Sequence, residues 1–329
     1  MNEHRRRIVL AVGALMAGGL PSMVKARSKP SIIAFVDIEA PGARAACETM
    51  RRTIERRFAG SRIKPVLVFV PSAPERTEET RRQLRIALET LRPTIVLAAA
   101  ARFAEYARDF ELGLPIIFNC PDESPVKRGL TDSLIRPSAG MTGFTIPPNT
   151  TLKRREMLLR LVPDCKVLGV FGTADDDETG MHDAQGSDSA LFKGIKKRYF
   201  YRDSVKELET FLRHPGVRRV DAWDVPYGGL SFLHADETVH AFSRTRLPVI
   251  YARVRHVRLG GMAAYEPKLE EVFDAWAEQI AAILDGVPVA DIPIVQSTRY
   301  SFALNLTALR KVGINPPKSL IKIADLVIQ

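Results

Sequence analysis

The sequence is poor in cysteine, the residue that most often marks covalent cross-links and metal sites. Its three cysteines, Cys47, Cys120 and Cys165, are odd in number and far apart. Such a set provides neither a disulfide framework nor the paired spacing of a metal site. We expect all three to be buried as small apolar side chains, and an oxidised pair stays an open alternative.

The chain also lacks the motifs of the common catalytic classes. It contains no Walker loop, no Gly-x-Ser-x-Gly turn, no His-Glu-x-x-His pair and no dinucleotide fingerprint after a strand. The acidic run Asp175–Glu178 lacks the spaced oxygen ligands and the glycine of a calcium loop, and is typical of a solvated loop. We therefore predict a protein that is not an enzyme and that has no cofactor and no metal.

The N-terminus has the pattern of an export signal. Arg5–Arg7 are basic, Ile8–Leu20 is apolar but too short to cross a bilayer, and Val24-Lys25-Ala26 has the small-x-small form of a cleavage site. We predict a signal peptide over residues 1–26, cleaved near Ala26, and a periplasmic mature protein. An uncleaved anchor is the alternative, and the sequence leaves general and twin-arginine export both open.

The formal net charge of +10 invites a nucleic-acid interpretation. However, no helix-turn-helix module precedes the globular part, and the export signal argues against a DNA-binding repressor. We therefore predict no nucleic-acid partner.

Strand and helix patterns alternate along the rest of the chain, in two series. The first has apolar strands at Ser31–Asp37, Pro65–Val70, Thr94–Ala98 and Pro115–Asn119, with helical spacing between them. The second has strand patterns at Lys166–Phe171, Arg198–Tyr201, Arg219–Ala222 and Pro248–Tyr251, with helices predicted at Leu152–Leu161, Ala190–Lys197 and Ser204–Arg213. Continuous apolar strands separated by helices indicate parallel sheets covered on both faces. The fold class is therefore α/β, with two lobes.

The order of several short blocks resembles a known family. The blocks include Leu247-Pro-Val-Ile-Tyr251, Gly260-Gly-Met-Ala-Ala-Tyr265, Asp291-Ile-Pro-Ile-Val-Gln296 and Tyr300-Ser-Phe-Ala-Leu-Asn305. Their sequence resembles the substrate-binding proteins of ABC transporters, in the family that includes tryptophan- and tyrosine-binding receptors. The resemblance implies a type I periplasmic binding fold, with two Rossmann-like lobes joined by a three-stranded hinge. It also implies a monomer that docks on an ABC permease in the inner membrane.

From this resemblance we assign residues 27–121 plus 262–292 to lobe 1 and residues 122–261 plus 293–329 to lobe 2. The chain is expected to cross between lobes near Cys120–Pro125, Gly260–Tyr265 and Pro293–Arg299. The helix predicted at Pro267–Leu284 is expected to pack on the first lobe although it lies late in the sequence.

Ligands of open α/β sheets bind outside the carboxyl ends of the strands, beside helix N-termini whose free N–H groups suit a carboxylate. The residues that follow the predicted strands are therefore the candidate ligand contacts, in a cleft that hinge motion closes. They are Glu39, Ala99, Ala100, Ala101, Asn119, Thr173, Tyr227 and Arg253.

Two of these positions depart from the family. Where its members often have a Gly-Thr/Ser-Pro turn this chain has Ala98–Ala101, and where they often have His-Pro it has Glu39-Ala40-Pro41. Both changes remove small polar groups, so the pocket is either more apolar or relies on the second lobe. Arg253 and Arg255, taken as one extended segment, could clamp an anion or form a solvated basic edge.

The function that these observations favour is capture of a small molecule, an amino acid or another carboxylate, by the solute-binding component of an ABC import system. A ligand-loaded sensor that docks on a periplasmic signalling receptor is one alternative, and an exported α/β enzyme is another. The sequence does not name the ligand.

Overall fold

The computed structural model describes residues 30–121, 124–137, 140–147, 149–173, 192–202, 204–217 and 219–329. The predicted signal peptide and the acidic run Asp175–Glu178 lie outside these residues. The chain divides into two compact α/β units: the first contains the described residues up to Cys120 with Pro125–Phe144 and Val272–Val295, and the second contains Pro121–Ser124, Thr145–Glu271 and Gln296–Gln329. Among the described helices, none combines the length and apolar character that a bilayer crossing requires.

The first unit is built on a six-stranded sheet in the order β11-β5-β4-β3-β1-β2. Strand β1 pairs in parallel with β2 and with β3, and β3 pairs in parallel with β4. The carboxyl ends of these four strands therefore meet at one edge of the sheet. The strands are β1 (Ile32–Ile38), β2 (Val66–Ser72), β3 (Ile95–Ala98), β4 (Ile116–Cys120), β5 (Met141–Thr145) and β11 (Val295–Gln296).

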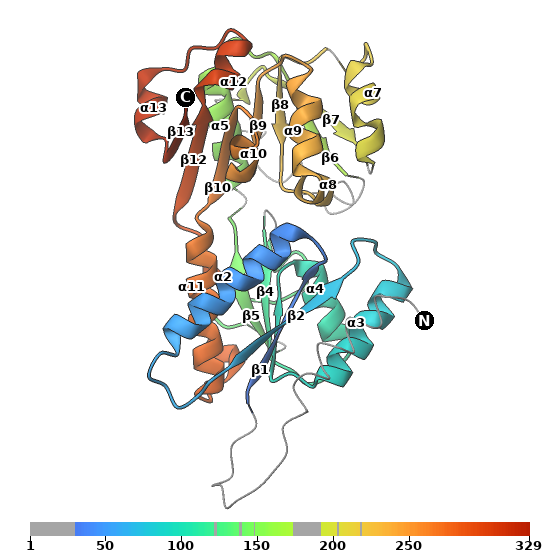
Figure 1. Cartoon of the computed structure of the whole chain (residues 1–329), viewed down its shortest axis with the longest axis vertical. Helices are drawn as coiled ribbons and strands as arrows, with labels where there is room; N and C mark the ends of the chain where they lie inside the picture. The colour runs from blue at the N-terminus through green and yellow to red at the C-terminus, as the bar shows by residue number, and fades with distance from the viewer. Residues whose placement is uncertain are drawn as a thin grey trace, which may run out of the picture. The chain divides into compact units, whose positions relative to one another are not determined.

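Helices cover both faces of this sheet (Figure 1). On one face, α2 (Pro41–Arg57) lies beside α11 (Leu269–Leu284), where Arg57 pairs with Glu278 at 2.7 Å and the Trp276 ring lies 6.2 Å from Phe35 of β1. These contacts confirm that the late helix packs on the first unit. On the other face, α3 (Glu78–Leu91) and α4 (Ala101–Asp109) pack against alternate β1 residues, Ala34 and Val36.

Local chemistry defines the ends of these helices. Thr77 caps α3, since its hydroxyl accepts a hydrogen bond from the Thr80 N–H at 3.1 Å. Glu78 and Glu79 place negative charge in the first turn, where the helix dipole favours it. The helix ends at Arg92, whose left-handed backbone (φ 49°) turns the chain toward β3.

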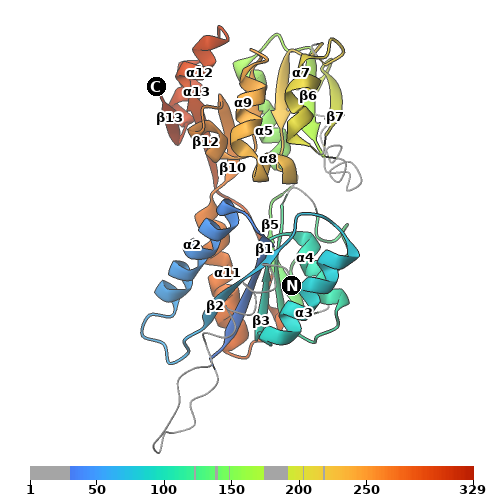
Figure 2. The same cartoon turned by 45° about the vertical axis from the view of Figure 1, so that its right-hand side comes forward.

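The second unit is built on a seven-stranded sheet in the order β13-β12-β10-β9-β8-β6-β7 (Figure 2). Its pairs are parallel except for β10 and β12, which run antiparallel. The carboxyl ends of β6, β7, β8, β9 and β10 therefore share one edge. The strands are β6 (Val167–Gly172), β7 (Lys196–Tyr201), β8 (Ala222–Val225), β9 (Val249–Tyr251), β10 (Ala263–Pro267), β12 (Tyr300–Asn305) and β13 (Leu326–Ile328).

Two hydrophobic clusters line the two faces of the second sheet. One contains Trp223 and Phe242 and packs against α7 (Leu208–Arg213), α8 (Gly229–Leu233), α9 (Ala235–Ser243) and α10 (Val254–Arg258). The other contains Leu168 and Ile250 and packs against α5 (Asn149–Leu161), α12 (Leu306–Lys311) and α13 (Lys318–Ile323). Two short 3-10 turns, η2 (Val205–Glu207) and η3 (Val289–Asp291), complete the described helices.

A fully buried charge cluster joins α5 to the second sheet. The carboxylate of Asp224 accepts hydrogen bonds at 2.7 Å from Nε of Arg154 and from Nε of Arg155, and all three side chains are at most 3% exposed. Burial alone would raise the pKa of Asp224, but the two guanidinium groups hold that pKa below its ordinary value. The cluster fixes α5 on β8 because neither charge type is stable in this interior without the other.

The structure corrects several predictions about boundaries. Residues 125–144, assigned to lobe 2, belong to the first unit because β5 extends the first sheet. Residues 263–267 were assigned to lobe 1, with 263–265 inside a crossing, but they form β10 of the second sheet, and the second unit continues to Glu271. Residues 293–295 belong to the first unit, and Lys196–Lys197, predicted as helix, begin β7.

The cysteine prediction is confirmed, since all three side chains are buried. Burial raises the pKa of the Cys47 thiol to about 11, and burial likewise raises the pKa of Cys165 to about 11. These two groups are therefore unreactive thiols at neutral pH.

Candidate ligand-binding site

The structure places the candidate residues of the first unit along the carboxyl edge of its sheet. Glu39 follows β1, Ala99 and Ala100 follow β3, Ala101 begins α4, and Asn119 lies near the end of β4. The parallel register that sets Val36 opposite Ala98 brings these segments together. The edge is therefore formed by backbone and a few polar side chains.

Two of these positions offer hydrogen-bonding groups. Ala100 is the N-cap of α4 and supplies no side-chain cap, so no hydroxyl competes for the N–H groups of the first turn. Asn119 donates its amide N–H to the Ala99 carbonyl oxygen at 3.3 Å, while its buried Oδ1 has no hydrogen-bond partner among the described residues. Its carbonyl oxygen can therefore accept a ligand N–H or O–H.

Glu39 has a partner within its own unit. Arg44 of α2 binds its carboxylate with two hydrogen bonds, Nε to Oε1 at 2.6 Å and Nη2 to Oε2 at 2.8 Å. The pair is partly exposed, with 32% of the Glu39 side chain accessible. Glu39 therefore presents a neutralised carboxylate at this edge.

The second unit carries a denser group at the carboxyl edge of its own sheet. The guanidinium of Arg253, which follows β9, lies over the Tyr227 ring at 4.4 Å from the ring centre. Phe232 of α8 lies 6.0 Å from Tyr227, and the same guanidinium is 5.8 Å from the Phe232 ring. One cation is thus held against two aromatic faces.

Glu266, at the end of β10, completes this group and was not predicted from the sequence. Its Oε2 lies 3.6 Å from Nη1 of Arg253, and the two side chains are 11% and 21% exposed. Burial raises the pKa of Glu266, and the nearby Arg253 guanidinium opposes that rise. The site therefore holds a cation and an acid side by side in a partly desolvated environment.

The alternative in which Arg253 and Arg255 clamp an anion from one extended segment is wrong. The chain is helical here rather than extended: Arg253 is the N-cap of α10, and Arg255 is exposed on that helix. In a helix, residues two apart do not share a side.

The buried ring of His256 contacts the backbone of Arg253. Its Nδ1 lies 3.3 Å from the Arg253 carbonyl oxygen and its Nε2 lies 3.1 Å from the Ser231 carbonyl oxygen, while its ring stacks on Tyr251 at 4.8 Å. Burial lowers the pKa of His256 to about 4, so the ring is neutral at pH 7. The histidine therefore ties α10 to α8 without adding charge.

Thr173 and Ser72 lie at two further strand ends. Thr173 follows β6, at the same edge of the second sheet as Tyr227, as predicted from the strand pattern. Ser72 ends β2 in the first unit, and its buried hydroxyl has no hydrogen-bond partner among the described residues. The sequence pattern missed Ser72 because the apolar run was taken to end at Val70.

Two α/β units whose parallel strands present polar and aromatic groups at their carboxyl edges define the chain as a binding protein of the type I periplasmic fold. The chain belongs to the family of ABC transporter substrate binding proteins, whose model matches residues 63–328. It is therefore a substrate-binding protein of the ABC-transporter type.

Solved structures of low sequence identity share this fold. The ABC domain in complex with L-Trp from Streptococcus pneumonia is 19% identical, with a TM-score of 0.78 over 92% of this chain and 100% of that chain. A conserved domain protein from Vibrio cholerae is 17% identical, with a TM-score of 0.76 over 91% of this chain and 100% of that chain. A solute binding protein from Agrobacterium vitis bound to alpha-D-tagatopyranose is 15% identical, with a TM-score of 0.58 over 90% of this chain and 99% of that chain. A search of curated proteins finds no match.

Proposed function

We propose that this chain is the periplasmic solute-binding component of an ABC import system. The observation that carries the proposal is the group formed by Tyr227, Arg253 and Glu266 at the carboxyl edge of the second sheet. In a chain of this family, a partly desolvated acid–base pair beside aromatic rings is suited to the polar end of a small organic molecule. The protein binds and releases this molecule and carries out no covalent step.

The chemistry of the group favours a ligand with a carboxylate. The Arg253 guanidinium has N–H groups in a planar fork that matches a carboxylate, and its face already stacks on Tyr227. Glu266 accepts a hydrogen bond from an ammonium or hydroxyl group on the same ligand. Tyr227 and Phe232 contribute apolar contact area. An amino acid or a hydroxylated carboxylate carries this set of groups.

The first unit contributes neutral hydrogen bonds in this proposal. The Asn119 Oδ1 accepts from the ligand, and the first-turn N–H groups of α4, after Ala100, donate to it. Ala99 and Ala101 allow close approach because they have no long side chains. Glu39 stays paired with Arg44, and Thr173 supplies a hydroxyl at the edge of the second unit.

Export and delivery follow from the same proposal. The N-terminal pattern directs the chain to the periplasm, and an ABC permease in the inner membrane is its docking partner. N-terminal sequencing of the exported protein should begin within a few residues of Arg27. A mature protein that keeps Met1 and sediments with membranes contradicts the export claim.

The ligand claim is tested on the mature protein purified from its native compartment. Denaturation and mass spectrometry of the released small molecules should identify a carboxylate, and titration calorimetry with that compound should give one site per chain. The proposal fails if nothing co-purifies and no amino acid, aromatic acid, carboxylate or sugar binds in a thermal-shift screen.

A further inference from the structure

The amino-terminal edge of the second sheet carries a row of exposed positive charges. Four neighbouring strands, in the order β9-β8-β6-β7, run parallel, so the turns that lead into them lie side by side at this edge. These turns are residues 163–166, 193–196, 219–221 and 246–248. Their basic side chains are all exposed, and we call them the basic edge: Lys166, Lys193, Lys196, Arg219 and Arg246.

The strand register sets four of these charges at nearly one level. The pairing of β6 with β7 continues into the turns, since the Lys196 N–H donates to the Lys166 carbonyl oxygen at 2.8 Å. The registers of β6 with β8 and of β8 with β9, continued in the same way, place Arg219 and Arg246 within about one residue of the level of Lys166. Because neighbouring strands are about 4.8 Å apart, the four cations form a row roughly 15 Å long.

Few acidic groups offset the basic edge. The same turns contain two acidic residues, Asp164 and Asp221, and Oδ2 of Asp221 accepts hydrogen bonds from the N–H groups of Lys166 and Val167 at 2.8 and 2.7 Å. Within the part of the chain that the structure describes, no side chain of the basic edge forms an ion pair. Like charges on neighbouring strands destabilise a sheet, so the stability of the fold does not account for this row.

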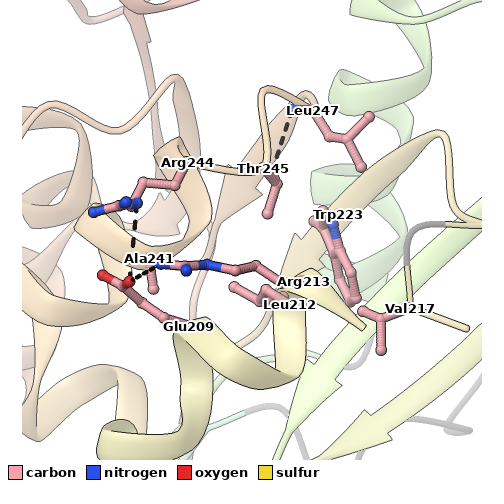
Figure 3. A pocket seen from close by; sticks show the side chains of 9 residues that line it. All are labelled: Glu209, Leu212, Arg213, Val217, Trp223, Ala241, Arg244, Thr245 and Leu247. Carbon is pink, nitrogen blue, oxygen red and sulfur yellow. Dashed lines mark hydrogen bonds and ion pairs between the residues drawn. The ribbon is translucent and has the colours of Figure 1, made fainter. Parts of the chain in front are cut away.

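Two further guanidinium groups border the basic edge. Figure 3 shows Arg213 of α7 and Arg244, at the end of α9, approaching the Glu209 carboxylate beside Leu247 of the turn before β9. Their nitrogens lie 2.7 and 3.8 Å from that carboxylate. Both arginine side chains are more than half exposed. One carboxylate faces two guanidinium groups, so this group is also net positive.

We propose that the basic edge is a docking surface for an anionic phospholipid bilayer. The row is exposed and extended, so it matches an array of phosphate groups on a surface, whereas a single small anion is held by converging groups in a concave site. Each Lys or Arg near an anionic bilayer strengthens binding by up to about fivefold. The proposal rests on the proposed function in one respect, the placement of the chain beside the inner membrane.

The composition of these turns favours lipid over nucleic acid. They contain no aromatic residue, whereas proteins that hold single-stranded nucleic acid stack its bases on aromatic side chains. Their larger apolar side chains, Ile195, Val220 and Leu247, are not exposed, so none inserts into the bilayer. The contact is therefore electrostatic, reversible and sensitive to salt.

Membrane contact and ligand capture use different surfaces of the second unit. The basic edge lies at the amino ends of β6, β7, β8 and β9, and Tyr227 and Arg253 follow the carboxyl ends of β8 and β9. Substitutions at one edge should therefore leave binding at the other unchanged.

Cosedimentation of the mature protein with lipid vesicles tests the proposal. Vesicles of phosphatidylcholine with about 30% phosphatidylglycerol should bind the protein at about 50 mM salt and release most of it at about 300 mM, because salt screens the attraction. Vesicles of phosphatidylcholine alone should bind it at neither salt concentration.

Charge-neutralising substitutions locate the contact. A triple variant with Lys166→Gln, Arg219→Gln and Arg246→Gln should bind the anionic vesicles about ten- to a hundredfold more weakly. Its unfolding temperature should be equal to that of the parent or higher, because the three side chains are exposed and like charges have been removed.

A matched control removes the same number of exposed charges from the first unit. It carries Arg52→Gln, Arg62→Gln and Lys64→Gln. It should change vesicle binding by less than about twofold, because these charges lie outside the docking surface and are screened. Titration of the co-purified ligand into both triple variants should give the parent affinity. Loss of ligand binding in the parent, with vesicle binding intact, contradicts the proposed function and leaves the docking surface standing.

Four outcomes overturn the proposal. One is the absence of binding to anionic vesicles at low salt. Another is an equal loss of binding in the two triple variants, which assigns the attraction to overall charge. The third is salt-insensitive binding that the Lys166, Arg219 and Arg246 substitutions leave intact. The fourth is tighter binding to a nucleic acid than to vesicles at equal phosphate concentration, which assigns the edge to a polynucleotide.

Discussion

Replacing Arg253 by alanine removes the guanidinium that lies 4.4 Å from the Tyr227 ring centre and 3.6 Å from Glu266. Hydrogen bonds to a charged group contribute about 1.5–3 kcal/mol, so a ligand carboxylate should bind roughly ten- to a hundredfold more weakly. The loss should exceed that of an exposed ion pair because the Arg253 side chain is 21% exposed and partly desolvated. Titration calorimetry with the co-purified ligand measures it.

Glu266→Gln makes the same experiment report the charge of the ligand. Removing this carboxylate should tighten a purely anionic ligand, because the Glu266 carboxylate then no longer competes with it for Arg253. It should weaken a zwitterion, because the ammonium group loses its acceptor. Tyr227→Ala is the companion variant, which should weaken either ligand through lost contact area without changing the salt dependence. Unchanged affinity in Arg253→Ala would refute this assignment and favour the interpretation of Arg253 as part of a solvated basic edge.

Three further substitutions, with one control in the first unit, test the physical account of the second unit. Asp224→Asn should lower the free energy of unfolding by about 3–5 kcal/mol, because Arg154 and Arg155 keep buried charges without their carboxylate, whereas Asp274→Asn at an exposed pair should cost less than about 1 kcal/mol. Burial lowers the pKa of His256 from its ordinary value of 6.5 to about 4 in the folded protein. The stability that the neutral ring provides should therefore be fully present above about pH 6.5, and the free energy of unfolding should fall by up to about 3 kcal/mol as the pH drops to 4. Chemical denaturation of His256→Gln should show this pH dependence abolished, and its persistence would contradict the assignment. Gly169→Ala should destabilise by about 1–3 kcal/mol and shift the Trp223 emission, since its Cβ would lie 2.6 Å from that ring; an unshifted spectrum would count against the close contact.

The strands that the sequence predicted well are those with strong local patterns. β1, β2, β3, β4 and β6 are continuous apolar runs bounded by turn residues, and α11 carries a clear apolar stripe. β5 was missed because Gly143 interrupts its apolar pattern. The neighbouring strand β4 leaves no room for a side chain at this position. A Cβ at Gly143 would lie 2.3 Å from the Phe118 carbonyl oxygen, a contact that depends on the sheet order and is not visible in the sequence.

The candidate site was predicted as a set of strand ends, but its internal pairing was not. The proximity of Arg253 to Glu266 arises because β9 and β10 are neighbours, with Ile250 opposite Ala263. The segment Ala263–Pro267 was predicted as the end of a crossing, Gly260–Tyr265, followed by the start of a helix at Pro267, so Glu266 was not considered as the end of a strand. Trp223 is buried, and the unpartnered state of its Nε1 among the described residues emerges only from packing.

The central claim is that the chain holds a small molecule at the strand-end residues and does so without chemistry. Its most direct test is a crystal structure of the mature protein with the molecule that co-purifies with it. The account predicts an unmodified ligand whose carboxylate contacts Arg253 and whose apolar part contacts Tyr227. A ligand bound away from both residues, or one found chemically altered by the protein, would contradict it.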